Sequence, residues 1–220
     1  MSKLPKKNIL VLAAHPDDET LGCGATISNL CRQGHNIQLL TFTDGVGSRR
    51  ANEENRNPKL EQISTILGIS KYSYGNFPDN EMDTVSLLDI CKFIESNIDY
   101  HPDIIFTHFM GDLNIDHQIV TRAALTVFRP QYGNKMKIYS YYVPSSTDYN
   151  SLTYFDGNSY LEVSAEDVKN KMNALNIYHE EMRPYPHSRS YENIENLMKV
   201  WGSEVGLLYC EKFKIIREIL

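Results

Sequence analysis

The chain has 220 residues, of which 41% are hydrophobic and 23% charged, as is usual for one globular domain. Its net charge of −6 argues against a nucleic-acid-binding protein, although a few local arginines would still suit an anionic ligand. No apolar run is long enough for a membrane span. The short apolar run after the basic start leads into acids at the place where a signal peptide would be cleaved. A cytoplasmic protein is therefore expected.

Strands and helices are predicted to alternate along most of the chain. We expect strands over residues 8–14, 37–43, around 72, 104–107 and 138–142, and helices over 21–34, 52–67, 85–99, 116–128, 165–182 and 191–205. This order predicts an α/β fold, a Rossmann-like and mainly parallel sheet with helices on both faces. The sequence favours a single domain over 1–220, with the α/β core over 1–142 and a C-terminal elaboration over 143–220.

The stretch "AHPDDE", residues 14–19, follows the first predicted strand, where ligands of open α/β sheets bind. The imidazole of His15 and the carboxylate of Asp18 are usual ligands of a divalent ion such as Zn²⁺. Asp17 would be left to take a proton from metal-bound water. The alternative is that these acids only cap the next helix, which they would also stabilise.

A second group of polar side chains follows the predicted strand "DIIFTH". His108 ends that strand, and Asp112, Asn114, Asp116 and His117 lead into the next helix. If the two strands are neighbours, His117 supplies the third ligand that a catalytic zinc site requires. Asp116 is expected either to orient an imidazole or to cap the helix.

"AHPDDE" followed by "DLNIDH" on such a chain resembles the PIG-L/LmbE-type N-acetylglucosaminyl deacetylases, which are zinc-dependent hydrolases of N-acetylated amino sugars. "TFTDGVGSRR", "ENRNPKLEQISTILGI" and "HSRSYENIENLMKVWGSEVGLLYCEKF" are similar to further segments of that family. The resemblance implies an LmbE-like fold and one zinc ion per chain. It assigns His15, Asp18 and His117 as zinc ligands, Asp17 as the general base, and Arg56, Asn114 and Asp116 as residues on the substrate side.

Asn114 departs from the family pattern, in which many members carry a histidine thought to act as an acid. Asparagine cannot transfer a proton, although it can donate a hydrogen bond. His187 and His108 are the candidate acids, with His187 preferred, and Asp17 could also return the proton itself. Arg49, Arg50 and Arg56 would suit a phosphate or a hydroxyl-rich sugar.

These expectations lead to an N-deacetylase that converts an N-acetylated amino sugar or glycoconjugate, free or nucleotide-linked, to acetate and an amine. The resemblance of the C-terminal segment implies bacterial glycan or surface-sugar biosynthesis, and a homo-oligomer is compatible with the sequence. Three alternatives compete with this interpretation: a nucleotide-binding Rossmann module using Gly22 and Gly24, an aspartyl-phosphate phosphatase, and a non-catalytic sugar-binding protein. The first lacks the full glycine fingerprint and has acids where a phosphate would lie.

Overall fold

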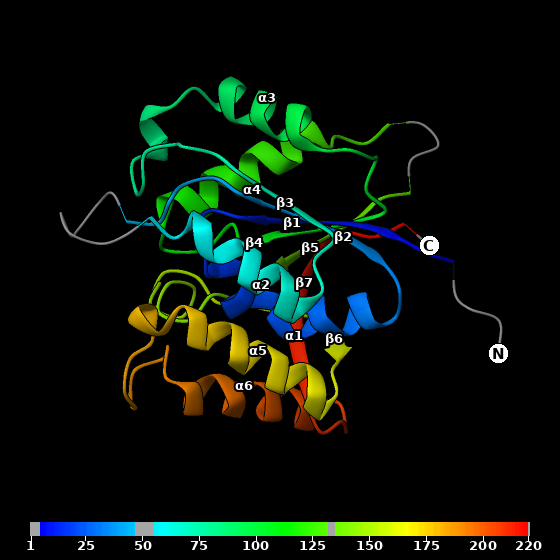
Figure 1. Cartoon of the computed structure of the whole chain (residues 1–220), viewed down its shortest axis with the longest axis vertical. Coiled ribbons are helices and arrows are strands. Elements are labelled where there is room, and N and C mark those ends of the chain that lie inside the picture. The colour runs from blue at the N-terminus through cyan, green and yellow to red at the C-terminus, as the bar shows by residue number, and fades with distance from the viewer. Residues whose placement is uncertain (1–4, 47–54, 132–134, 220) are drawn as a thin grey trace.

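The computed structural model describes residues 5–46, 55–131 and 135–219, and within them the strands form one seven-stranded sheet (Figure 1). The strands are β1 (Asn8–Ala13), β2 (Asn36–Thr41), β3 (Lys71–Tyr74), β4 (Ile104–His108), β5 (Lys137–Tyr141), β6 (Ser159–Glu162) and β7 (Cys210–Arg217). Their order is β3-β2-β1-β4-β5-β7-β6. All pairs are parallel except those of β7, which runs antiparallel to both β5 and β6.

Helices cover both faces of the sheet, which confirms the predicted fold class. They are α1 (Asp18–Arg32), α2 (Leu60–Leu67), α3 (Leu87–Asn97), α4 (Ile115–Val127), α5 (Ala165–Ile177) and α6 (Tyr191–Glu204). Figure 1 shows α3 and α4 on one face and the other four on the opposite face, where α5 packs against α1 and α2. Each face has its own apolar core, and β1 contributes alternate side chains to both. A strand buried on both sides needs a continuous apolar run, as "ILVLA" supplies.

Several predicted helix boundaries differ from the structure, and two strands were missed. Of the helix expected over 52–67, the described part begins at Leu60, because Pro58 disfavours helical backbone before it and the chain forms a 3₁₀ turn over Asn57–Lys59 instead. The helix expected to 182 ends at Ile177, and a second 3₁₀ turn follows over His179–Glu181. Helix α1 begins at Asp18 rather than Leu21. Strands β6 and β7 were not predicted at all.

The chain direction across the sheet reverses between β1 and β4. From β1 the chain adds β2 and β3 on one side, and then crosses to β4 on the other side. Val11 of β1 pairs in parallel register with Phe106 of β4, so both strands end at the same edge. Loops diverge at such a point and leave a crevice, which is where open α/β sheets bind ligands.

Helix α1 is broken at Cys23, whose backbone (φ −146°, ψ 23°) is not helical. The break leaves the carbonyl of Leu21 and the N–H groups of Ala25 and Thr26 without their usual helical partners. Lys171 Nζ donates to the Leu21 carbonyl at 2.8 Å, while the carboxylate of Glu211 accepts from Ala25 N at 3.2 Å and from Thr26 N at 2.7 Å.

Lys171 and Glu211 also pair with each other, Nζ to Oε1 at 2.6 Å, and both are buried. One buried ion pair, with Lys171 on α5 and Glu211 on β7, therefore satisfies the broken turn of the helix that carries Asp18.

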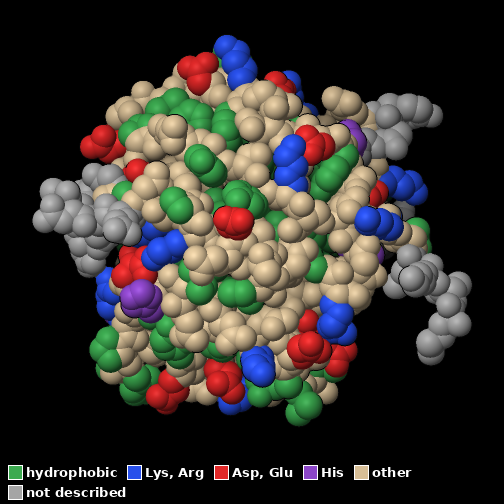
Figure 2. Space-filling view, in the orientation of Figure 1, with side chains coloured by type: hydrophobic (Ala, Val, Ile, Leu, Met, Phe, Trp, Pro, Cys, Tyr) green, Lys and Arg blue, Asp and Glu red, His purple; other side chains and the backbone are tan. Residues whose placement is uncertain are grey.

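Among the residues that the structure describes, every helix is too short or too polar to cross a bilayer. On the face seen in Figure 2, acidic and basic side chains are intermixed rather than gathered by sign.

Candidate active site

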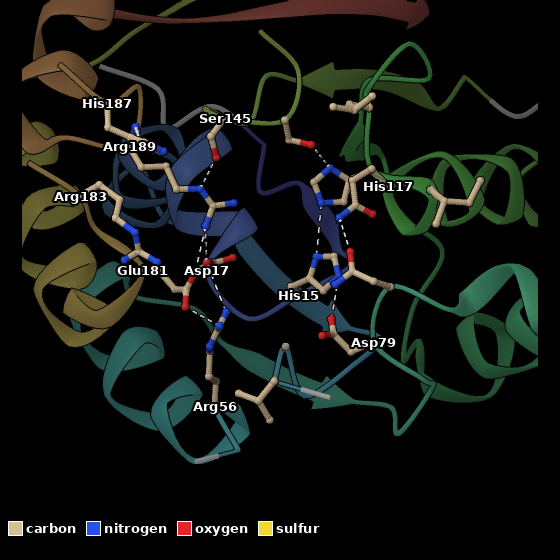
Figure 3. A pocket seen from close by; sticks show the side chains of 17 residues that line it. His15, Asp17, Arg56, Asp79, His117, Ser145, Glu181, Arg183, His187 and Arg189 are labelled. Atoms are coloured by element: carbon tan, nitrogen blue, oxygen red, sulfur yellow. Dashed lines mark hydrogen bonds and ion pairs between the residues drawn. The ribbon is translucent and has the colours of Figure 1, made fainter. Parts of the chain in front are cut away.

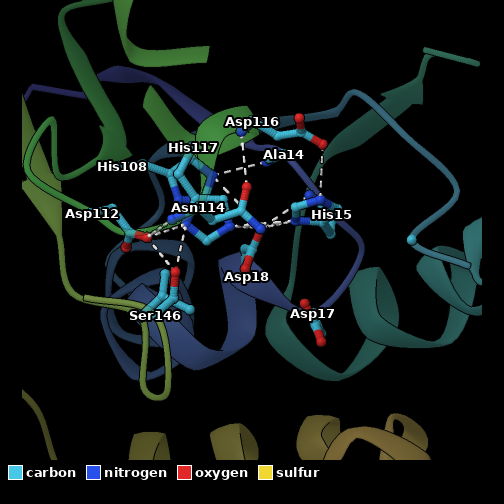
Figure 4. A network of polar contacts seen from close by, with 12 residues as sticks. Ala14, His15, Asp17, Asp18, His108, Asp112, Asn114, Asp116, His117 and Ser146 are labelled. Atoms are coloured by element: carbon cyan, nitrogen blue, oxygen red, sulfur yellow. Dashed lines mark hydrogen bonds and ion pairs between the residues drawn. The ribbon is translucent and has the colours of Figure 1, made fainter. Parts of the chain in front are cut away.

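Three side chains from the segments that follow β1 and β4 converge at the ends of these strands (Figure 4). Asp18 Oδ2 lies 3.0 Å from His15 Nδ1 and 3.2 Å from His117 Nε2, and these two nitrogens are 3.3 Å apart. All three residues are buried. His15 follows β1, Asp18 opens α1 and His117 lies in the first turn of α4, so the predicted adjacency of the two strands brings the expected ligands together.

The arrangement of these atoms fits a tetrahedral metal ion. Ligands at about 2.0–2.2 Å from a tetrahedral zinc lie about 3.3–3.6 Å from one another, close to the separations of 3.0–3.3 Å found here. The second oxygen of Asp18, Oδ1, is buried and accepts no hydrogen bond within the described residues, as expected of an atom whose natural partner is a cation. The donor set of two imidazoles and a carboxylate is one that zinc prefers.

Each of the two histidines, His15 and His117, has a carboxylate on its other ring nitrogen. His15 Nε2 lies 3.1 Å from Asp79 Oδ1 and 3.2 Å from Asp116 Oδ2, and His117 Nδ1 lies 3.2 Å from Asp112 Oδ1. Such carboxylates fix the ring orientation and make the metal-binding nitrogen more basic. Burial alone would raise the pKa of Asp112, but His117 and hydrogen bonds from two hydroxyl groups lower it to about 2.

Charges in the cluster also set the protonation of its imidazoles. Burial lowers the pKa of His117, but the carboxylates of Asp18 and Asp112 outweigh it and raise the pKa to about 9. His108, by contrast, has a pKa well below its usual value because of burial and the neighbouring His117. Its Nε2 accepts from Ala14 N at 2.8 Å, and its ring stacks on His117 at 3.9 Å. His108 is fully buried and does not line the cavity, which removes it as a candidate acid.

Asp17 occupies the N-cap position of α1 but makes no side-chain cap. Its φ of 138° is strained for a residue with a side chain, and such strain persists where the surroundings hold it. The strained turn directs the carboxylate into the cavity while Asp18 faces the histidines (Figure 4). Burial raises the pKa of Asp17 to about 6, against the opposing charge of Arg189.

Two arginines and a glutamate surround the Asp17 carboxylate (Figure 3). Arg189 Nη1 lies 3.2 Å and Arg56 Nη1 3.5 Å from Asp17 Oδ2. Glu181 joins the two arginines, with Oε1 2.5 Å from Arg56 Nη2 and Oε2 3.3 Å from Arg189 Nη1. We call Asp17, Arg56, Glu181 and Arg189 the charge clamp.

A cavity of about 660 Å³ opens between the charge clamp and the three converging residues His15, Asp18 and His117, which we call the histidine cluster. Its lining includes Arg56, Asn114 and His187, the expected substrate-side residues and candidate acid. The amide of Asn114 is already engaged, since Oδ1 accepts from Asp116 N at 2.8 Å and Nδ2 donates to Asn80 Oδ1 at 2.9 Å.

The structure places His187 on the outer side of the cavity. Its Nδ1 accepts from the backbone of Arg189 at 3.0 Å, and Figure 3 shows Arg189 between His187 and the cluster. Its ring makes an edge contact with Tyr149.

Asp116 was expected on the substrate side, but the structure places it behind His15 and away from the cavity. It is fully buried, does not line the cavity, and accepts from Asn80 N at 2.7 Å and Met82 N at 3.1 Å in addition to contacting His15. It therefore orients the His15 imidazole, as the pattern of residues also allowed, rather than facing the cavity. Arg49 and Arg50 lie outside the described residues.

Sequence reasoning did not identify Asp79, Glu181 or Arg189. Asp79 lies in "FPDNEMD" after the short strand β3, and Glu181 and Arg189 belong to the C-terminal part of the chain. Of these three residues, only Arg189 lies in a segment that resembles the family, "HSRSYE", and could have been found from the sequence in that way.

Comparison with known proteins identifies the family of this chain. The family model of the PIG-L domain, described as GlcNAc-PI de-N-acetylase, matches residues 10–128. The uncharacterized deacetylase YaiS of Escherichia coli is 31% identical over 137 residues, which span 56% of this chain and 69% of that protein. A 1D-myo-inositol 2-acetamido-2-deoxy-alpha-D-glucopyranoside deacetylase of Kribbella flavida is 44% identical over 45 residues, 20% of this chain and 15% of that one.

Among solved structures, the conserved protein TT1542 from Thermus thermophilus has the same fold, with a TM-score of 0.76 at 21% identity over 97% of this chain and 96% of that chain. The family match extends over more than half of the sequence and contains all three converging residues of the histidine cluster. The chain therefore belongs to the PIG-L family of deacetylases, hydrolases that act on N-acetyl amides.

Proposed function

We propose that the protein is a zinc-dependent hydrolase that removes the acetyl group from an N-acetylated amino sugar or glycoconjugate and releases acetate and a free amine. The observation that carries the proposal is the set of three ligand atoms 3.0–3.3 Å apart, with a carboxylate behind each imidazole. In this proposal His15, Asp18 and His117 hold the metal, and Asp17 is the general base.

When bound, zinc would supply Lewis-acid chemistry, polarising a carbonyl oxygen and making water a stronger acid. The Asp17 carboxylate, directed into the cavity, takes a proton from the attacking water as its oxygen bonds to the acetyl carbon. The same carboxyl group then returns the proton to the amine nitrogen as the C–N bond breaks. A pKa of about 6 suits a group that must both accept and donate a proton near neutrality.

Neither of the other candidate acids is better placed for this step. His108 is buried behind His117, and His187 lies beyond Arg189. The amide of Asn114 has its own partners and carries no transferable proton. We therefore assign both proton transfers to Asp17, with His187 as a contact for the distal part of the substrate.

The substrate proposal follows from the cavity and from the relatives. Arg56 lines the cavity, and the Asn114 amide has a second N–H beyond the one it donates to Asn80, so both can donate to sugar hydroxyls. A volume of about 660 Å³ accommodates more than one sugar ring. The Kribbella relative is named for an N-acetylated glucosamine joined to inositol. We infer an amino sugar carrying a second group, nucleotide-linked or otherwise, that serves bacterial glycan or surface-sugar biosynthesis.

Acetate release from a panel of N-acetyl sugars, glycosides and nucleotide-linked sugars tests the proposal. We expect about one zinc per chain by elemental analysis and turnover of at least one panel member. The matched control is the same panel with the de-acetylated sugars, which yield no acetate. A metal-free protein that retains a nucleotide through purification would contradict the proposal and favour the Rossmann alternative.

A further inference from the structure

Arg189 is anchored on two sides within the cavity wall. Its Nε donates to Ser145 Oγ at 2.7 Å and to the Pro144 carbonyl at 3.2 Å, both in the loop after β5. Its Nη1 donates to Asp17 Oδ2 at 3.2 Å and to Glu181 Oε2 at 3.3 Å. The guanidinium is planar, so fixing Nε also fixes the direction in which Nη1 points.

The Asp17 side chain depends on such a contact. Its strained backbone is held locally, since its N–H donates to Glu19 Oε2 at 3.1 Å and its carbonyl accepts from Thr20 N and Leu21 N. These bonds fix the main chain but leave the carboxylate free to rotate. Among the described residues, the carboxylate has ion-pair partners only in Arg189 and Arg56.

Of the two arginines, Arg189 is the better placed to orient Asp17. It is the nearer to Asp17 Oδ2, by 3.2 Å against 3.5 Å, and its Nε is held by Ser145 on the side away from Asp17. Glu181 in turn holds both guanidinium groups and so sets their spacing. Arg189 and Glu181 both lie beyond the segment that the family model matches, so this contact belongs to the C-terminal part of the chain.

We propose that Arg189 is a positioning residue that holds the Asp17 carboxylate against the reacting atoms, with Glu181 fixing the guanidinium in place. The consequence for turnover rests on the proposed function, because it requires Asp17 to act as the base. The position of the carboxylate does not depend on that function and can be measured by itself. Arg189 lies in the turn before α6 and bonds both to the loop after β5 and to Asp17 Oδ2 at the start of α1, so it connects these three parts of the chain.

The kinetic test compares R189A, R189K and a matched control, R32A, whose arginine pairs with Asp167 on the outside of α1. We expect R189A to lower kcat about 100-fold, because a misplaced group costs rate rather than affinity, and to leave KM within about threefold. The kcat of R189K should lie between those of R189A and the wild type, because an ammonium group cannot keep the contacts with Ser145 and Asp17 at the same time. R32A should match the wild type in kcat.

Chemical rescue separates positioning from loss of structure. Guanidinium ion added to R189A should restore kcat about tenfold by occupying the vacated place, and should not restore D17N, where the orienting partner is intact but the base is absent. Zinc content equal to that of the wild type excludes damage to the metal cluster. Unchanged kcat in R189A, or equal rescue of both variants, would overturn the proposal.

A crystal structure of zinc-loaded R189A decides the point without any assay. We expect the Asp17 carboxylate to rotate away from the cavity, while His15, Asp18 and His117 keep their places. An unmoved carboxylate in this structure would refute the positioning role. If the wild type releases no acetate from any substrate, the proposed function fails, and this crystallographic result still decides the role of Arg189.

Discussion

Neighbouring aspartates at the start of α1 have opposite surroundings. Burial raises the pKa of both carboxyl groups, but His117 and His108 bring that of Asp18 well below its usual value, whereas Asp17 remains raised at about 6. The strained φ of Asp17 separates the two side chains, so that one faces imidazoles and the other faces arginines. Residues adjacent in sequence thereby become suited to different tasks, one to binding a cation and the other to moving a proton.

This division predicts different outcomes for two single substitutions. D17N should retain zinc but lose turnover by about 100-fold or more, because an amide cannot accept the proton. H117A should lose both zinc and turnover, because it removes a ligand atom from the cluster. Elemental analysis and acetate release on the same preparations measure both properties. Near-normal turnover in D17N would exclude Asp17 as the base.

At the scale of the elements, the break in α1 makes the active site depend on the C-terminal part of the chain. The Cβ of any residue replacing Gly22 would come within 2.2 Å of the Tyr141 ring, so the helix passes close to β5 just before the break. Lys171 and Glu211 then satisfy the backbone groups that the break exposes. The first turn of α1, which carries Asp18, is thus oriented separately from the rest of the helix.

Removing either side chain of the Lys171–Glu211 ion pair should destabilise the folded state. E211A leaves the Lys171 charge buried and two backbone N–H groups without an acceptor, so we expect the free energy of unfolding to fall by about 3–5 kcal/mol. The matched control is E204A, which breaks the more exposed pair with Lys212 and should cost less than about 1 kcal/mol. Urea denaturation measures both. Equal effects for the two variants would show that the break in α1 needs no buried pair.

At the scale of the whole molecule, the sequence predicts the parallel part of the sheet better than its edge. Strands β1, β2 and β4 are apolar runs that end in turn residues, and their alternation with helices indicates the fold and the edge where ligands bind. Strand β6 has only four residues, and four of the eight residues of the antiparallel β7, "CEKFKIIR", are charged, so neither has the pattern of a buried strand.

The histidine cluster was predictable because its residues lie in two compact motifs on strands expected to be neighbours. The charge clamp was not, because Arg189 and Glu181 reach Asp17 and Arg56 only through the packing of the C-terminal part against α1 and α2. Charged residues on loops have no periodicity that would reveal such a meeting in advance.

Because the cluster joins the loops after β1 and β4, metal should stabilise the molecule as a whole. A ligand that binds only the folded state, present at 100 times its Kd, adds about 2.7 kcal/mol, which for a chain of this size raises Tm by about 5–10 °C. We therefore expect a chelator to lower the Tm of the zinc-loaded protein by about that amount. H117A should show no shift, and calorimetry measures both. A chelator effect of equal size in H117A would contradict the assigned ligands.

The position of β7 has a consequence for the order of events during synthesis. This strand lies between β5 and β6 although it is made after both, so β6 has no neighbour in the sheet until β7 arrives. Glu211 lies on β7, so the N–H groups of Ala25 and Thr26 at the break in α1 gain their acceptor only when β7 has been made. On the ribosome, His15, Asp18 and His117 emerge long before this strand. We therefore expect the nascent protein to complete the proposed metal site last, so that tight zinc binding would require the finished fold.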